Sequence, residues 1–268
     1  YTESVPTFTD AGTYTVYYKA SAANHTEATG SFVVTIDKAK TDKLQFEYTN
    51  ASVEYTGKAQ GTSVTFKGNS QENQVLTVSY KEKSGNAYAD AETNPTNIGI
   101  YGVFVSFKGN SNYEEVNDLL IGDFEITAKA MGGVTIENIP EQAYTGTNIE
   151  PKVDVKDGTT PLTKGTDYDV EYENNQNVGK ANVKVTGKGN YTGDKTVEFT
   201  ITPAELTNVS VKQSSYLIYD GNEQKISVTT AATTVDGVQV MFVYSEKENG
   251  SYTESVPTFT DAGTYTVY

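Results

Sequence analysis

The sequence predicts an all-β protein that consists of repeated small antiparallel sandwiches. Its composition points this way, because 20 Tyr and 23 Gly accompany many Thr, Val and Asn, which are residues of strands and turns. Apolar and polar residues alternate in segments such as 32–36, 183–185 and 197–201, as expected for strands with one buried face. No segment has the periodicity of an amphipathic helix.

An identical internal repeat is the strongest organising signal. Residues 1–17 and residues 252–268 both read YTESVPTFTDAGTYTVY, so the sequence returns on itself after 251 residues. Weaker repeats lie inside this period. A turn of the form D/N-x-G leads into a strand at 10–12, 97–99 and 177–179, and opening patterns with an aromatic residue and a glycine lie at 55–57, 144–146 and 219–221.

These patterns predict junctions after residues 39, 130 and 203. Segments 40–130 and 131–203 are then complete repeats. Segment 1–39 is the C-terminal fragment of a repeat, and segment 204–268 is the N-terminal part of another. The two fragments, without the duplicated residues, join into one unit, so the 251-residue period holds units of 87, 91 and 73 residues. Short linkers predict units stacked end to end in an elongated, semi-rigid rod, with limited bending near Gly132.

Charge and composition exclude several classes of function. The net charge is −15 and every basic residue is Lys, which disfavours nucleic-acid binding and a polybasic membrane surface. The absence of Cys removes disulfides and thiolate metal sites, and it agrees with an exported bacterial chain. No apolar run is long enough for a membrane span, and the first residues do not read as a signal peptide. We therefore expect targeting and anchoring segments outside this stretch.

Segment 131–203 resembles a known family. It contains YTG, P-x-V-x-V, L-x-x-G-x-D-Y-x-V-x-Y-x-N-N-x-N-x-G, G-N-Y-T-G and F-T-I in this order. This pattern is similar to the MBG-type immunoglobulin-like repeats of large bacterial surface proteins and adhesins. The resemblance is looser over 40–130 and weaker over 204–268 joined to 1–39. It implies tandem small antiparallel immunoglobulin-like β-sandwiches with an extracellular structural or adhesive role, and no particular ligand.

The residues of the D/N-x-G turns have a structural interpretation. The glycines are expected where φ is positive, and the Asp or Asn side chains can bond to nearby backbone. Two of the following tyrosines resemble the tyrosine corner of immunoglobulin-like sandwiches, in which the ring packs inside and the hydroxyl meets a backbone group. The third repeat has Ala181 there. The predicted turn and corner residues are Asp10, Gly12, Tyr14, Asn97, Gly99, Tyr101, Asn177 and Gly179.

Two loops are candidates for ligand contact. Asn112 and Tyr113, and likewise Asn190 and Tyr191, combine an amide with an aromatic ring, which suits carbohydrate binding. Turn chemistry alone also explains these residues, since hairpin turns favour Asn and Gly. We expect the turn interpretation over a glycan site.

Metal binding and catalysis have weaker support. Two acidic clusters could bind calcium, but neither has the residue spacing of an EF-hand, so calcium is only a minor alternative. The first cluster contains Glu114, Glu115, Asn117 and Asp118, and the second contains Asp167, Asp169 and Glu171. We otherwise expect no cofactor. His25 is the only histidine and takes the place of a loop tyrosine, so we expect no enzyme. Lys and Asn abound, but no motif favours an isopeptide bond between them.

The sequence therefore predicts a non-catalytic stalk of a bacterial cell-surface protein, whose partners are further copies of the same repeat. Two alternatives remain open. The repeats can themselves bind a glycan or a host surface protein. Alternatively, residues 18–39 of one copy can complete residues 204–251 of another by strand complementation. We expect the incomplete terminal segments to reflect a longer polypeptide rather than such pairing.

Overall fold

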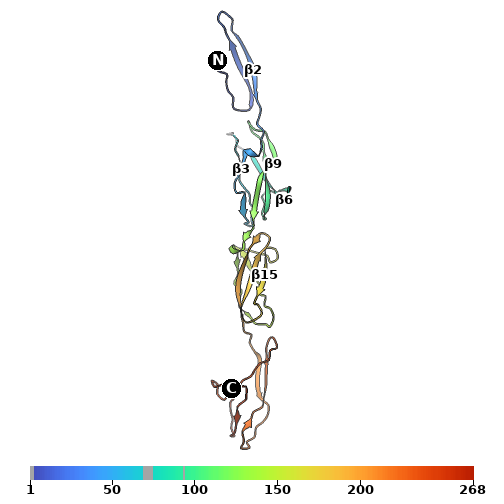
Figure 1. The fold of residues 1–268 in the computed structure, drawn as a ribbon, viewed down its shortest axis with the longest axis vertical. Coiled ribbons are helices and arrows are strands. Elements are labelled where there is room, and N and C mark those ends of the chain that lie inside the picture. Colours follow the sequence, from blue (N-terminus) through green and yellow to red (C-terminus); the bar gives the residue numbers. More distant parts are fainter. Residues whose placement is uncertain (1–2, 69–74, 93) are drawn as a thin grey trace. The chain divides into compact units, whose positions relative to one another are not determined.

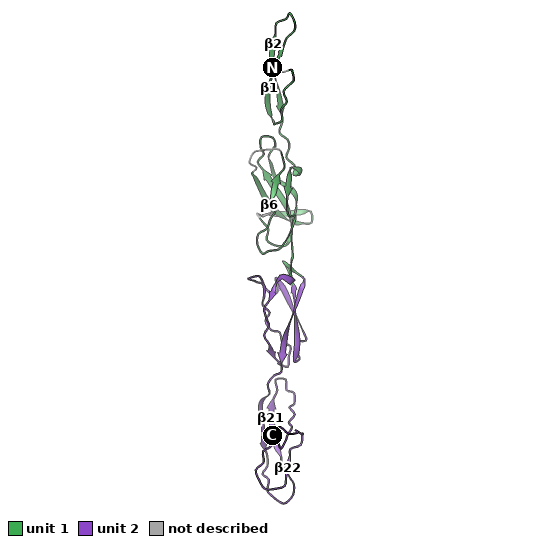
Figure 2. Cartoon of the chain, turned by 90° about the vertical axis from the view of Figure 1, so that its left-hand side faces the viewer, with its two compact units in different colours: residues 1–130, 187–192 green, residues 131–186, 193–268 purple. Residues whose placement is uncertain are grey.

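A computed structural model describes residues 3–68, 75–92 and 94–268 of the chain. This described part is all-β, and its helical segments are two single 3₁₀ turns, η1 Lys43–Gln45 and η2 Met131–Gly133. Contacts divide the chain into two compact units, coloured green and purple in Figure 2. Residues 1–130 and 187–192 form the first unit, and residues 131–186 and 193–268 form the second.

The first segment of the first unit is a β-hairpin. Strands β1 Gly12–Ala20 and β2 Ala28–Ile36 pair in antiparallel fashion along their whole length (Figure 1). Val16 is its one buried apolar side chain among the described residues, while Tyr17 and Val33 are 69% and 62% exposed. A two-stranded hairpin with two largely open faces has too little buried surface to be stable alone.

Segment 40–130 contains two sheets. The smaller sheet pairs β3 with β5, and the larger has the order β4-β9-β8-β6-β7. The strands of this segment are β3 Phe46–Tyr48, β4 Ser52–Glu54, β5 Val64–Phe66, β6 Leu76–Ser84, β7 Ala87–Glu92, β8 Gly99–Phe107 and β9 Val116–Thr127, followed by β10 Lys129–Ala130.

The core of segment 40–130 lies between these sheets. Phe46 of the small sheet is buried against Phe107 of the large sheet, with ring centroids 6.4 Å apart. A second cluster contains Tyr80 and Phe124, whose ring centroids are 5.6 Å apart. Burial raises the pKa of the Tyr80 hydroxyl, which accepts a hydrogen bond from the Thr62 N–H at 2.7 Å. The β8 pattern of consecutive buried residues agrees with a central strand covered on both faces.

Segment 131–203 has the same arrangement of one larger and one smaller sheet. Their orders are β12-β18-β16-β15 and β11-β13-β14, and the core includes Val183, Val185, Phe199 and Ile201. The strands are β11 Thr135–Ile136, β12 Gln142–Ala143, β13 Val155–Asp157, β14 Thr160–Pro161, β15 Tyr168–Glu173, β16 Gly179–Gly187, β17 Tyr191–Thr192 and β18 Asp194–Thr202.

One strand pair in each of these segments is parallel, which departs from the predicted antiparallel sandwich. β4 pairs in parallel with β9, and β12 pairs in parallel with β18. The next residue makes the same bond in both segments. The Tyr55 N–H donates to the Thr127 carbonyl and the Tyr144 N–H to the Thr202 carbonyl, each at 2.9 Å. The two segments are therefore built alike at the strand that precedes each Y-T-G pattern.

Segment 204–268 has little core. Its strands β19 Thr207–Gln213 and β21 Val228–Thr233 pair with each other, as do β20 Gln224–Lys225 and β22 Thr258–Phe259. Tyr244 is its one buried apolar residue among those described. Tyr216 is completely exposed, so this segment leaves apolar surface uncovered.

Aromatic rings anchor the D/N-x-G turns. The hydroxyls of Tyr14, Tyr101 and Tyr265 each donate to the carbonyl four residues earlier, at 2.8, 2.9 and 2.8 Å. Tyr101 is buried, as a tyrosine corner requires. The glycines differ. φ is positive at Gly99 and Gly179, at 156° and 132°, but not at Gly12, so the expectation of a positive φ is wrong there.

Candidate functional site

The described residues contain no group of three or more His, Cys, Asp or Glu side chains that could hold a metal ion. In the first acidic cluster, Asp118 pairs with Lys81 at 2.5 Å. In the second cluster, Asp167 accepts the Thr163 N–H at 2.8 Å, and Glu171 lies on the exposed face of β15. These carboxylates belong to a solvated strand face and to ordinary ion pairs.

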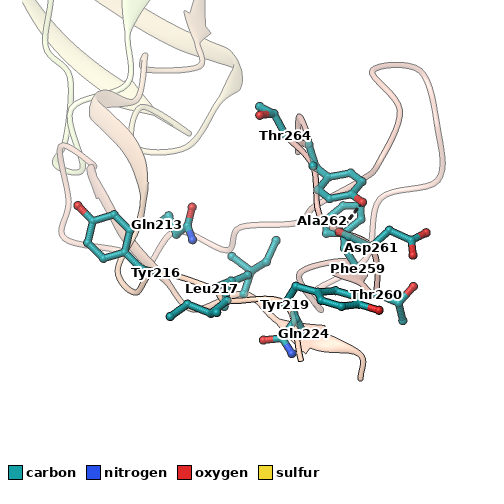
Figure 3. Close-up of a pocket in the computed structure, with 14 residues that line it drawn as sticks. Gln213, Tyr216, Leu217, Tyr219, Gln224, Phe259, Thr260, Asp261, Ala262 and Thr264 are labelled. Atoms are coloured by element: carbon teal, nitrogen blue, oxygen red, sulfur yellow. Dashed lines mark hydrogen bonds between the residues drawn. The ribbon is translucent and has the colours of Figure 1, made fainter. Parts of the chain in front are cut away.

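His25 does not form a catalytic arrangement. Its Nδ1 lies 2.9 Å from the Ala23 carbonyl in an exposed turn. A pocket in segment 204–268 is lined by Tyr216, Leu217 and Phe259, and Asp261 is the one carboxylate among its described lining residues (Figure 3). The pocket therefore offers apolar surface but no acid–base pair. Across the described residues, no helix has the length and apolarity to span a bilayer.

Asn112 makes the first notable contact between distant parts of the first unit. Its Oδ1 accepts the Ala11 N–H at 2.7 Å, and its Nδ2 donates to the Asp10 carboxylate at 2.9 Å. Its own carbonyl accepts the Ala39 N–H at 2.9 Å. Since an N–H group can only donate and a carboxylate only accept, these partners fix the orientation of the amide. One asparagine thus binds both the D/N-x-G turn and the end of segment 1–39.

Asn190 makes the same three contacts in the first unit. Its Oδ1 accepts the Ile98 N–H at 3.0 Å, and its Nδ2 donates to the Asn97 Oδ1 at 3.1 Å. Its carbonyl accepts the Lys129 N–H at 3.0 Å. We call this three-point contact the asparagine clamp. The two clamps are formed by Asn112 on Asp10, Ala11 and Ala39, and by Asn190 on Asn97, Ile98 and Lys129.

Strand register explains why the clamp recurs. We call β2 and β9 closing strands, because each is the last long strand of its segment. The turn glycine lies opposite an isoleucine of the closing strand in both cases, Gly12 opposite Ile36 and Gly99 opposite Ile126. The clamped N–H groups therefore come from equivalent positions, one residue before the glycine and three residues after the isoleucine. A short parallel bridge accompanies each clamp, at Ala39 with Tyr113 and at β10 with β17.

The four side chains considered as ligand-facing are occupied by contacts within the chain. The Tyr191 ring is 6% exposed, and its centroid lies 5.6 Å from that of Tyr55 in an edge-on arrangement. Tyr113 packs edge-on against Phe66 with centroids 5.0 Å apart. Asn112 and Asn190 use their amides in the clamps. The sequence could not reveal that these side chains are occupied, because each clamp joins residues that lie 92 or more residues apart on its turn side.

A different contact links the Y-T-G pattern of segment 131–203 to segment 204–268 in the second unit. The Tyr144 hydroxyl donates to the Asp236 carboxylate at 2.9 Å. Gly146 has φ of +80°, and a Cβ there would lie 2.8 Å from the Asp236 Cβ. Glycine is therefore required both by its backbone conformation and by the close approach of Asp236.

This contact is expected to respond to acid. The hydrogen bond from Tyr144 holds the pKa of Asp236 below its ordinary value of 3.8. A carboxylate with a lowered pKa stabilises the folded contact above its ordinary pKa, and that stabilisation is lost as the pH falls through the lowered value. We expect Tyr144→Phe to move the Asp236 midpoint upward in an NMR titration. An unchanged midpoint would show that the hydroxyl does not reach the carboxylate.

The two clamps are expected to differ in their response to Asn→Asp. Asn112→Asp places a carboxylate against that of Asp10, whereas Asn190→Asp faces the Asn97 amide, which can turn and donate. Loss of one clamp bond costs about 1 kcal/mol, and like charges add to this at the first clamp. Hydrogen exchange at Ala11 should therefore accelerate more than at Ile98, and Asp10→Asn should restore the slow rate. Equal acceleration without rescue would contradict this charge account.

A comparison with protein-family models finds no match for the chain, and a comparison with curated proteins finds none either.

Proposed function

We propose that the chain is a non-catalytic tandem-repeat stalk of a bacterial cell-surface protein or adhesin. In this proposal, immunoglobulin-like β-sandwiches of the MBG type follow one another in an elongated rod outside the cell and hold a distal functional domain away from the wall. The partners of each repeat are further copies of the repeat in the same polypeptide.

One observation carries this proposal, which is the recurrence of the asparagine clamp. The most distinctive loop residues, Asn112 and Asn190, use their side-chain amides to bind the end of the segment before their own. The stability of a repeat array is approximately the sum of the stabilities of its repeats and of the contacts between neighbouring repeats. Hydrogen bonds between adjacent repeats, such as those of the clamp, add to the second contribution. The identical 17-residue recurrence agrees with such an array, since repetition sets length rather than chemistry.

Surface display tests the stalk function. The chain is placed between a cell-wall anchor and a reporter domain, and a second version lacks segment 40–130. We expect the reporter to keep its affinity for a soluble ligand in both versions, but to reach ligand on large beads less well in the shorter one. If the bare chain binds a glycan array or host extracellular protein, the repeats themselves are binding modules and the pure stalk proposal fails.

A further inference from the structure

The first and last strands of each larger sheet are hydrogen-bonded neighbours. In segment 40–130, β4 is the first strand of the sheet in chain order and β9 is the last, and they pair in parallel. In segment 131–203, β12 and β18 have the same places and pair in the same way. Because the paired strands run in the same direction, the chain enters each pair at one end and leaves it at the opposite end. Tension on the chain therefore pulls the two strands past each other and acts on all bonds of the pair at once.

A threonine hydroxyl adds a bond to each of these pairs. The Thr127 hydroxyl donates to the Val53 carbonyl at 3.1 Å, and the Thr202 hydroxyl donates to the Gln142 carbonyl at 3.3 Å. Each threonine directly follows the isoleucine that lies opposite the turn glycine of its segment. The tyrosine N–H bonds described above end on the carbonyls of these same threonines. Each threonine thus ties the last strand to the first through both its hydroxyl and its carbonyl, and we call the two residues latch threonines.

The two parallel pairs differ in extent. β4 and β9 have three residue pairs in register, whereas β12 and β18 have two. Val53 of β4 also packs against the buried cluster that contains Phe124, so sliding of β4 exposes apolar surface. In β12 the equivalent residue is Gln142, whose amide donates to the nearby Pro140 carbonyl at 2.9 Å. The β12–β18 pair is therefore the weaker of the two.

We propose that these parallel pairs carry tension along the stalk and open in a fixed order, segment 131–203 before segment 40–130. The stalk then lengthens in steps, and each step limits the tension that reaches the distal domain. Longer antiparallel pairs, such as β6 with β8, do not lie between the entry and the exit of the chain, so they are loaded only after the first pair has opened. The inference rests on the proposed stalk function and adds to it a conformational response to force.

Single-molecule stretching of the full chain at constant force tests this order. The chain has no Cys, so Lys40→Cys and Glu205→Cys supply two unique attachment points that place both complete segments under load. Unfolding releases at most about 330 Å of chain from segment 40–130 and at most about 260 Å from segment 131–203, because an extended residue spans up to about 3.6 Å. The two steps are therefore identified by their lengths. Only molecules that show both steps are counted, since both segments were then folded.

We expect the shorter step to come first in most molecules. Thr202→Val removes the latch hydroxyl but keeps a β-branched residue, so the waiting time before the shorter step should fall about fivefold, the effect of losing one hydrogen bond. Thr127→Val should shorten the waiting time before the longer step by a similar factor and leave the shorter step unchanged. Thr77→Val is the matched control and should change neither waiting time, because Thr77 lies on β6, outside both loaded pairs.

Three results overturn the fixed order of opening. The longer step comes first in most molecules, the latch variants leave both waiting times unchanged, or Thr77→Val shortens them as strongly as the latch variants do. Any of these results leaves the stalk proposal standing if deletion of segment 40–130 still reduces the reach of the displayed reporter, so the two failures are distinguishable.

Discussion

Phe124→Ala is expected to lower the free energy of unfolding of segment 40–130 by about 3–5 kcal/mol. Phe124 is fully buried in β9, and its ring packs against Tyr80 beneath the central strands. Truncation removes the buried ring and leaves a cavity that a two-layer sheet core cannot fully close. Urea unfolding followed by NMR resonances of segment 40–130 measures the change.

Phe32→Ala is the matched control for this prediction. Phe32 has the same side chain and also lies in a closing strand, but it is 47% exposed. Its truncation should change stability by less than about 0.5 kcal/mol. A loss below about 1 kcal/mol for Phe124→Ala would mean that the sheets do not enclose the core described here.

Gly109→Val is expected to destabilise the loop that carries the first clamp by about 1–3 kcal/mol. Gly109 has φ of +77°, and a Cβ there would lie 2.9 Å from the Glu115 nitrogen and 2.9 Å from the Tyr113 carbonyl oxygen. Both are backbone atoms, so no side-chain movement can relieve the contact. The loop must shift, and Asn112 then loses its partners. Hydrogen exchange at Ala11 and Ala39 should accelerate together.

Gly85→Val separates backbone strain from the loss of the clamp. Gly85 also has positive φ, at +61°, but a Cβ there meets nothing within 4 Å. Strain alone should therefore destabilise this variant while exchange at Ala11 stays slow. Accelerated exchange at Ala11 in both variants would show that strain anywhere in segment 40–130 opens the contact, which contradicts a specific role for the loop.

Local patterns predicted much of the fold, because strands and turns are encoded over a few residues. The alternation in 32–36, 183–185 and 197–201 lies within β2, β16 and β18. The Tyr101 hydroxyl donates to the Asn97 carbonyl, four residues earlier in the chain. Such a local contact can be predicted from the spacing between the tyrosine and the turn.

Contacts between distant segments escaped the sequence. Asn190 and Tyr191 predicted a hairpin turn, with a carbohydrate loop as the alternative, because an exposed amide beside an aromatic ring suits a sugar. A turn pattern does not show which residues the loop contacts in the folded chain. Asn190 accepts a hydrogen bond from the N–H of Ile98, which lies 92 residues away in the sequence. Strand formation also depends on the partner. Residues 12–17 form part of β1 opposite β2, whereas the identical residues 263–268 lie outside the named strands.

Small-angle X-ray scattering of the full chain tests the proposed tandem stalk most directly. A single compact domain of 268 residues would have a radius of gyration of about 18 Å. The stalk proposal predicts a value well above this, with a skewed distance distribution that has a long tail, at concentrations low enough for monomers. A radius of gyration near 18 Å with a symmetric distance distribution would contradict an elongated array of repeats.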